Sequence, residues 1–177
     1  MAVAADFRTD LAFADERRLR LEANFYAKYC RDNRFVSLER SDGSLYIQKH
    51  CHIDCVVASR AGGSLTVEEK IVRWKGRAYT AIVVETHSNL ERTSDEPIGD
   101  GWIKTSVADC LLYAFEQEDG SLRVWLFDLP KLRGWFMQNF ERFAVTDKRN
   151  DFYTTRCRVV PLDQIPSDCV RAQDKAA

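Results

Sequence analysis

The apolar positions in the first half of the chain indicate one helix followed by several strands. Leu21, Phe25 and Tyr29 recur every four residues between Asp10 and Arg34, which predicts a helix with one apolar side. Extended segments are predicted at residues 35–40, 45–47, 51–58, 65–71 and 79–86. The continuous run Ala81-Ile82-Val83-Val84 predicts that the last of these is a central strand, covered on both faces.

The second half of the chain predicts helices that alternate with strands. Ser106 and Asp109 fit a capping box, so we expect a helix from Ser106 to Phe115. Residues 122–127 are expected to return as a strand. Asp128 is expected to cap a further helix, with Pro130 in its first turn. Residues 157–160 should form a last short strand, and an irregular tail should follow from residue 161. This order predicts an α/β (α+β) fold with a mixed central β-sheet flanked by helices.

Length and composition favour one globular domain. The chain has 177 residues, of which 45% are hydrophobic and 30% are charged, so it can bury a substantial core. We expect residues 1–177 to form one domain, with residues 1–9 and 167–177 frayed. No apolar run is long enough to cross a membrane and no leader pattern is visible, which predicts a cytoplasmic protein. The six cysteines are therefore expected to be reduced thiols.

The charge balance limits the kind of nucleic-acid binding that the chain can support. The formal net charge is −1, whereas proteins that coat duplexes tightly usually carry a basic excess. A locally basic face remains compatible with this total. Arg17, Arg18 and Arg20 in the predicted first helix are interpreted either as a solvated helix face or as contacts to phosphate.

The predicted strand at residues 65–71 carries the most informative chemistry. Side chains alternate along a strand, so Glu68 and Lys70 share one face and Glu69 lies on the other. A glycine-rich turn at residues 60–64 joins this strand to the preceding one, which predicts a hairpin. Asp54 can then meet Glu68 at one end of the sheet. Two carboxylates beside a lysine can hold a divalent cation and position a water molecule.

This arrangement resembles the PD-(D/E)XK nuclease superfamily, the fold of many restriction endonucleases. Asp54 matches the first acid of the family motif, Glu68 the second acid and Lys70 the lysine. The resemblance covers roughly residues 22–127, and it also includes the local sequence Gly101-Trp102, which is similar to a small group of phage and bacterial proteins. It implies a restriction-endonuclease-like core, a DNA substrate and, as in many nucleases of this fold, a homodimer.

The resemblance also implies a metal-dependent hydrolysis of phosphodiester bonds. Mg²⁺ (or Mn²⁺) prefers oxygen ligands, which Asp54 and Glu68 would supply, and Glu85 at the end of the next strand is a further candidate ligand. A bound metal ion activates water and stabilises charge on the phosphate. Lys70 would orient the attacking water or stabilise the developing negative charge.

Two positions depart from the family pattern. The residue before the first acid is Ile53 rather than proline, and the spacer between acid and lysine is Glu69 rather than an apolar residue. A buried, unpaired glutamate is costly, so we expect Glu69 either to pair with an arginine or to lie on an exposed edge.

Several further residues are candidates for contact with the substrate. Gln48, Lys49 and His52 lie just before or beside the first acid. Lys104 and Ser106 lie at the start of the predicted second helix, where free backbone N–H groups favour an anion, although Ser106 could equally serve only as a cap.

Other functions were weighed against the nuclease hypothesis. His50, Cys51, His52 and Cys55 could suggest zinc, but alternation along a strand separates the histidines from the cysteines. The sequence has no Gly-x-Ser-x-Gly elbow and no glycine-rich nucleotide-binding loop, so no nucleotide cofactor is expected. The near-neutral charge and Glu69 favour a rival hypothesis, a catalytically inactive nuclease-fold protein of phage origin with a binding or regulatory role. An RNA-directed nuclease is a third hypothesis.

Overall fold

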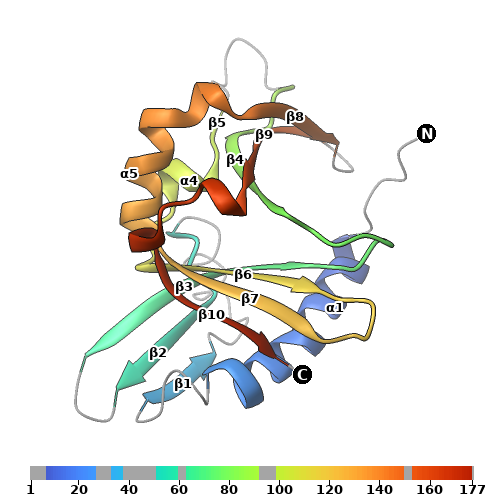
Figure 1. The fold of residues 1–177 in the computed structure, drawn as a ribbon, viewed down its shortest axis with the longest axis vertical. Coiled ribbons are helices and arrows are strands. Elements are labelled where there is room, and N and C mark those ends of the chain that lie inside the picture. The colour runs from blue at the N-terminus through green and yellow to red at the C-terminus, as the bar shows by residue number, and fades with distance from the viewer. Residues whose placement is uncertain are drawn as a thin grey trace.

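The fold consists of two β-sheets packed in layers, with helices on the outside and between them (Figure 1). The structure is a computed structural model and describes residues 7–26, 33–37, 51–59, 63–91, 99–149 and 153–176. The elements are mixed α and β, which confirms the predicted α+β class at this coarse level. Among the described residues, no helix is long and apolar enough to cross a membrane.

The larger sheet has six strands and carries the candidate site. Its order is β1 (Asn33–Ser37), β2 (Cys55–Ser59), β3 (Ser64–Val72), β6 (Cys110–Glu116), β7 (Leu122–Asp128) and β10 (Val170–Ala176). Neighbouring strands are antiparallel except β3 and β6, which run parallel. The predicted hairpin is confirmed, because β2 pairs with β3 in the register Cys55↔Val67.

The smaller sheet has four strands and is built from two separate parts of the chain. Its order is β5 (Gly99–Asp100), β4 (Ala81–Ser88), β9 (Thr154–Pro161) and β8 (Ala144–Arg149), all antiparallel. The chain leaves the larger sheet after β3, adds β4, β5 and the short helix α4 (Trp102–Thr105), and then returns as β6. This excursion sets the smaller sheet beside the end of β3.

Helices and short turns complete the layers. These elements are α1 (Phe7–Arg20), the π-helical turn η1 (Leu21–Tyr26), α5 (Leu129–Asn139) and the 3₁₀ turns η2 (Phe140–Arg142), η3 (Leu162–Gln164) and η4 (Ser167–Cys169). The predicted cap of α5 is confirmed, because the Asp128 carboxylate accepts a hydrogen bond from the Lys131 backbone N–H at 3.2 Å and Pro130 lies in the first turn.

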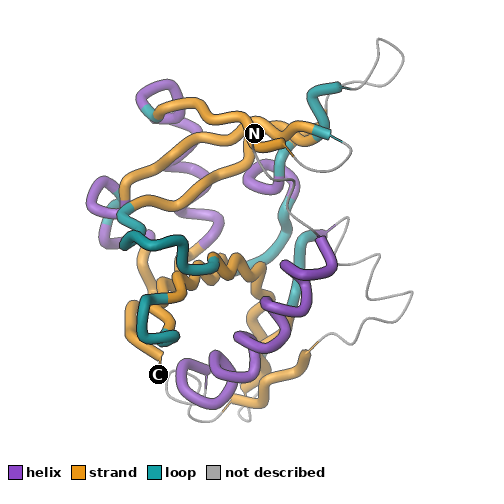
Figure 2. The backbone as a smooth tube through the Cα atoms, turned by 90° about the vertical axis from the view of Figure 1, so that its right-hand side faces the viewer, coloured by secondary structure: helices purple, strands orange, loops and turns teal. Residues whose placement is uncertain are grey.

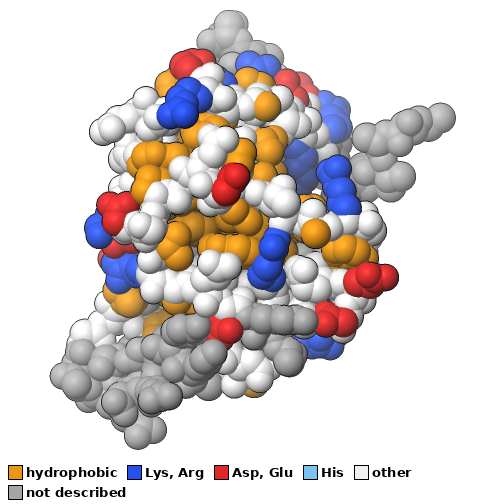
Figure 3. Space-filling view, in the orientation of Figure 1, with side chains coloured by type: hydrophobic (Ala, Val, Ile, Leu, Met, Phe, Trp, Pro, Cys, Tyr) orange, Lys and Arg blue, Asp and Glu red, His pale blue; other side chains and the backbone are white. Residues whose placement is uncertain are grey.

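Two apolar cores lie on opposite faces of the larger sheet. The first helical segment crosses one face of the larger sheet (Figure 2). On this face Leu21 and Phe25 pack with residues of β2, β3, β6 and β7. The opposite face packs against α5 and the smaller sheet, with Ile82, Phe127 and Phe136 at its centre. Figure 3 shows hydrophobic side chains across the middle of the molecule, where this second core reaches the surface between the two sheets.

The predicted first helix is largely confirmed, but one part of its pattern is not. Leu21 and Phe25 are buried as expected, while Leu19 is 66% exposed. Arg17 and Arg18 do not belong to a solvated face, since they pair with Glu116 and Glu69 on the larger sheet. Arg20 remains 41% exposed and donates to the Gly120 carbonyl at 2.8 Å.

The helix expected from Ser106 to Phe115 is wrong. Residues 110–116 form β6, in which every residue is buried. A strand buried on both faces has no polar alternation, so its apolar residues also satisfied a helical spacing. Asp119 and Gly120 lie in the turn between β6 and β7, where Gly120 has a φ of 77°.

Two further expectations about strands are wrong. The strand at residues 81–88 is not central in a doubly covered sheet. It lies in the smaller sheet, and Val83 within its apolar run is 38% exposed. The end of the chain is not an irregular, frayed tail either, because Val170–Ala176 forms β10 and pairs with β7 along the edge of the larger sheet.

Candidate functional site

Asp54 lies at the entrance to β2 with its side chain against β3. Its backbone N–H donates to the Val67 carbonyl at 2.8 Å, and its Oδ2 accepts a hydrogen bond from the Glu69 backbone N–H at 2.7 Å. These two bonds continue the β2–β3 ladder by one residue. They hold the Asp54 carboxylate beside the strand position from which Glu68 projects.

Glu68 and Lys70 project from the same face of β3, as the alternation predicts. Glu68 is 2% exposed, and its Oε1 forms an ion pair with the Lys70 ammonium. The Lys70 Nζ also lies 5.7 Å from the centre of the Trp102 ring, which favours the charged form of the lysine. The carboxylates around it raise the pKa of Lys70 although burial opposes this, so the side chain stays protonated.

Two other carboxylates influence Glu68. Burial raises the pKa of Glu68 to about 7; Lys70 opposes the shift, while Asp54 and Glu85 add to it. Burial likewise raises the pKa of Glu85, against the influence of Lys70 and Lys148. Glu68, paired with Lys70, is therefore within electrostatic reach of both Asp54 and Glu85.

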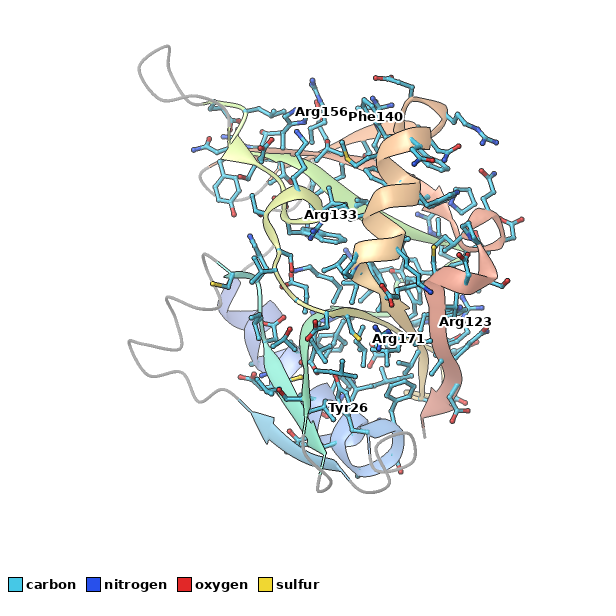
Figure 4. The ribbon with its side chains drawn as sticks, turned by 90° about the vertical axis from the view of Figure 1, so that its left-hand side faces the viewer. Tyr26, Arg123, Arg133, Phe140, Arg156 and Arg171 are labelled. Atoms are coloured by element: carbon cyan, nitrogen blue, oxygen red, sulfur yellow. The ribbon has the colours of Figure 1, made fainter. Side chains whose placement is uncertain are left out.

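Gly101 allows Trp102 to approach this cluster. The Gly101 N–H donates to the Thr86 carbonyl at 3.0 Å, and any side chain at position 101 would collide with the backbone of Glu85. Arg133 on α5 donates to the carbonyls of Ile103 and Ser106, which fixes α4 from the other side (Figure 4).

The chemistry of the donors fits a hard divalent cation, although they do not form a closed cage. In the described part of the chain, no three or more Asp, Glu, His or Cys side chains are arranged to hold a metal ion by themselves. Mg²⁺ typically takes only one or two carboxylates and completes its shell with water and substrate oxygens. Asp54 and Glu68 supply carboxylates of this kind, and their partial neutralisation by one lysine leaves negative charge for a cation.

Glu69 lies on the opposite face of β3. It pairs with an arginine, which confirms the first of the two alternatives expected for this residue. The Arg18 Nε donates to Glu69 Oε2 at 2.6 Å, and the Tyr26 hydroxyl donates to Oε1 at 2.9 Å. Tyr26 lies between the first helix and the strands of the larger sheet (Figure 4). The backbone N–H of Glu69 is the group that holds Asp54, so this buried network lies directly behind the site.

A groove of about 270 Å³ opens beside Lys70, between β3 and the smaller sheet. Its walls include Glu85, Trp102 and Tyr113, together with Lys148 and Tyr153 from the β8–β9 hairpin. The Tyr113 hydroxyl accepts a hydrogen bond from the Val83 backbone N–H at 3.1 Å, which joins the two sheets at the floor of the groove.

The residues predicted to contact substrate lie in different environments, and some lie outside the described residues. Gln48 and Lys49 lie outside the described residues. Lys104 pairs with Asp100 at 2.6 Å at the surface, at the end of α4 and not at the start of a longer helix. Ser106 is 1% exposed and its hydroxyl donates to the His52 carbonyl at 3.2 Å, so in this structure it has no surface with which to contact substrate.

The residues considered for zinc do not occupy one strand face. His50 lies outside the described residues. His52 has a φ of 51° and precedes β2, so the alternation assumed for it does not apply. Cys55 is buried beside Tyr26 and Glu69, and burial raises the pKa of its thiol, which keeps it protonated. The cysteines in the described segments, Cys51, Cys55, Cys110, Cys157 and Cys169, are all free.

Sequence reasoning missed Lys148 and Tyr153. They belong to the β8–β9 hairpin, which joins β4 by pairing across the smaller sheet. No local motif marks them. An exposed tyrosine beside a lysine-bearing strand is the signal that could have made Lys148 and Tyr153 candidate site residues. Both lie far from Lys70 in the sequence, so the sequence does not show that they are neighbours of Lys70 in the fold.

Comparisons with known proteins do not identify a family. No protein-family model matches the chain, and no similar curated protein or solved structure was found. The functional assignment therefore depends on the geometry of the site.

Proposed function

We propose that this protein is a metal-dependent nuclease of the PD-(D/E)XK type that hydrolyses phosphodiester bonds of DNA. The observation that carries the proposal is the position of the Asp54 carboxylate against β3, beside the Glu68–Lys70 ion pair, with Glu85 and Lys70 lining one groove. Burial raises the pKa of Glu68, and the nearby carboxylates of Asp54 and Glu85 raise it further, so a cation bound at Glu68 would relieve this repulsion. The adjoining groove gives a substrate access to Lys70.

The topology of the larger sheet supports the proposed fold family. An antiparallel hairpin carries the two acids and the lysine, and the next strand of that sheet, β6, runs parallel to the lysine-bearing strand. A restriction-endonuclease-like core requires such a mixed sheet. The connection to β6 differs from a simple helix, since it contains β4, β5 and α4.

The side chains can divide the work of hydrolysis among them. Asp54 and Glu68, with Glu85 as a further ligand, would hold Mg²⁺ or Mn²⁺, which supplies an activated water and neutralises phosphate charge. Lys70 carries a fixed positive charge that can orient a water molecule or stabilise negative charge on the phosphate oxygens.

A cleavage assay with matched variants tests the proposal. Purified protein is incubated with single-stranded, duplex and branched DNA in Mg²⁺ or Mn²⁺. Asp54→Asn and Lys70→Met should each lower the rate at least about a hundredfold, because each removes a charge at the reacting phosphate. Lys75→Met, at an exposed lysine beyond the end of β3, is the control and should retain wild-type activity. Equal rates for all variants would reject the assignment.

A second candidate is a catalytically inactive nuclease-fold protein with a binding or regulatory role. It is favoured by the ion pair between Lys70 and Glu68, which neutralises one candidate ligand, and by the lack of a three-ligand cluster among the described residues. Titration calorimetry with Mn²⁺ separates the two candidates. Binding that Asp54→Asn and Glu68→Gln abolish supports the nuclease, whereas no binding supports the inactive protein.

A further inference from the structure

The groove beside Lys70 is formed by side chains from three separated parts of the chain. Lys70 comes from β3 and Glu85 from β4, while Lys148 and Tyr153 come from the β8–β9 hairpin. In that hairpin Lys148 pairs with Thr155, whose hydroxyl donates to the Lys148 carbonyl at 3.4 Å. The hairpin therefore holds a lysine and a tyrosine next to the candidate catalytic lysine.

The surface of the groove combines aromatic and cationic groups that water can reach. Tyr153 is 39% exposed and Val83 is 38% exposed, so part of an aromatic ring and an apolar side chain face the solvent there. Lys148 is exposed as well. Aromatic rings provide stacking surfaces for nucleobases, and lysines provide charge for the phosphates that link them.

The charge of the lining distinguishes this groove from a larger cavity elsewhere. A cavity of about 860 Å³ at the β6–β7 turn is lined by Glu118, Asp119, Asp174 and a single cation, Arg123, together with uncharged residues. Its excess of carboxylates would repel a polyanion. The groove beside Lys70 has two lysines and one carboxylate, Glu85, in its lining.

The size of the groove limits what it can admit. Its volume of about 270 Å³ lies just below the range of about 300–1,000 Å³ that is usual for small-molecule pockets. One nucleotide-sized unit fits such a space, but a base pair with its stacked neighbours does not. A strand that enters the groove must therefore present an unpaired nucleotide.

We infer that the groove binds one unpaired nucleotide of a DNA single strand, with its base against Tyr153 and its phosphate against Lys148. This binding places the neighbouring phosphodiester beside Lys70. The inference rests on the proposed function, because it names the substrate class of the same site: a single-stranded segment or end, and not an intact duplex.

Glu85 leads to an expectation of opposite sign: its replacement should strengthen metal-free binding of a single strand, whereas replacing Tyr153 or Lys148 should weaken it. Glu85 lines the same groove as Lys148 and Lys70, and both lysines interact electrostatically with its carboxylate, so without metal it competes with a phosphate for these cations. Replacing Glu85 by glutamine removes this competition. Metal-free affinity for a single strand should then rise, although the same change would remove a candidate metal ligand.

The test measures binding in EDTA, where no cleavage occurs, by fluorescence anisotropy of a labelled single-stranded 12-residue oligodeoxynucleotide. Tyr153→Ala should raise Kd between about 5-fold and about 100-fold, since stacking on an aromatic ring is lost. Tyr153→Phe keeps the ring and should bind within about twofold of wild type. Lys148→Met should raise Kd and lower the slope of log Kd against log salt by about one. Glu85→Gln should lower Kd, and Lys75→Met is the control.

Competition experiments with unlabelled nucleic acids identify the class of ligand that the groove binds. Unlabelled single-stranded DNA should displace the probe, and a blunt duplex of the same sequence should compete at least tenfold more weakly. Deoxyadenosine monophosphate that competes as well as the 12-residue strand would overturn the strand assignment in favour of a free nucleotide. An oligoribonucleotide that binds more tightly would overturn the assignment to DNA.

The inference and the proposed function can fail separately. Binding that depends on Tyr153 and Lys148, without any cleavage in Mn²⁺, would support the inference and reject the nuclease. Cleavage that requires Asp54 and Lys70, with binding unchanged in Tyr153→Ala, Lys148→Met and Glu85→Gln, would overturn the inference and leave the nuclease in place.

Discussion

Glu69 is a charged residue at a position where the strand pattern calls for an apolar one. It lies on the face of β3 that packs against the core under α1, and it is 7% exposed. Arg18 and Tyr26 supply its hydrogen bonds from the helical segment. The buried charge is thereby compensated, and the pairing fixes the helix at the strand whose other face carries Glu68 and Lys70.

Removing the partner of Glu69 should be strongly destabilising. Arg18→Gln leaves a buried carboxylate without its cation, so we expect the free energy of unfolding to fall by about 3 kcal/mol or more. Urea denaturation followed by circular dichroism measures this. Arg77→Gln, at an exposed arginine, is the control and should change stability by less than about 0.5 kcal/mol.

A double variant separates the cost of an unpaired charge from the value of the pair. Arg18→Met combined with Glu69→Leu removes both charges and keeps apolar volume, so most of the lost stability should return. A double variant no more stable than Arg18→Gln would show that the network stabilises the fold in some way other than charge compensation.

Glu68 should make the stability of the protein depend on pH near neutrality. Its pKa is about 7 in the folded protein and about 4.5 in an unfolded chain, so the folded state holds the proton more tightly. Stability from this group is present below about pH 4.5 and is lost as pH rises toward 7. Between pH 4 and pH 8, wild type should lose about 3 kcal/mol more than Glu68→Gln.

Denaturation curves of both proteins across this pH range check the prediction. Comparing the two slopes cancels the groups that they share, including Glu69. Parallel curves for wild type and Glu68→Gln would contradict a raised pKa at this position.

At the residue scale, the sequence correctly predicted which side chains share a strand face and which need a cation, but it did not predict which residues pair with them. Alternation along one strand correctly separated Glu68 and Lys70 from Glu69, because that rule depends only on backbone geometry. The cost of a buried charge correctly required a cation for Glu69. That the cation is Arg18, which was interpreted as a surface residue, depends on how α1 crosses the sheet, and no local pattern contains this information.

At the scale of elements, the junction of β3 and β6 is held by a reciprocal set of bonds. The Asp109 Oδ2 accepts from the Thr66 backbone N–H at 2.8 Å and from its hydroxyl at 2.9 Å. The Thr66 hydroxyl oxygen in turn accepts from the Asp109 backbone N–H at 3.0 Å. This clasp closes the parallel pair immediately before its first paired residues, Val67 and Cys110, and so fixes the register of the two strands.

Loss of the clasp should weaken the parallel pair. Asp109→Ala removes a charged acceptor of two hydrogen bonds, and we expect the free energy of unfolding to fall by about 2 kcal/mol. Asp109→Asn keeps one acceptor oxygen and should cost about half as much. Urea denaturation of both variants measures the order, with Asp163→Ala at an exposed aspartate as the control. Equal stability of all three variants would show that the clasp contributes nothing.

The same segment shows why element prediction failed in the second half of the chain. Asp109 follows Ser106 at the spacing of a capping box, yet its carboxylate serves Thr66 on another strand. The apolar residues after it satisfy a helical spacing because β6 is buried on both faces and has no polar positions to reveal its period. Where a local signal is present, as with the glycine-rich turn before β3 and the Asp128 cap of α5, the predictions are confirmed.

At the scale of the molecule, β6 connects the two cores. Leu111, Tyr113 and Phe115 face the core that contains the smaller sheet, while Leu112 and Ala114 face the core under α1. Any loss of packing on one face therefore disturbs the backbone that supports the other. We expect the described domain to unfold as one cooperative unit despite its two sheets.

Leu112→Ala tests this coupling because its probe lies across the sheet from the change. Leu112 is fully buried in the core under α1, whereas Trp102, Trp125 and Trp135 belong to the opposite core. The cavity should lower the free energy of unfolding by about 2–5 kcal/mol. Tryptophan fluorescence and far-ultraviolet circular dichroism should then report the same shifted midpoint, as they should for Ile82→Ala in the smaller sheet. Val107→Ala, at a side chain that is 63% exposed, should leave both midpoints in place.

A fluorescence midpoint that stays at the wild-type value in Leu112→Ala would show that the cores unfold independently. The groove between β3 and the smaller sheet could then open without the loss of the Asp54–Glu68–Lys70 cluster, because all three residues belong to the β2–β3 region of the larger sheet.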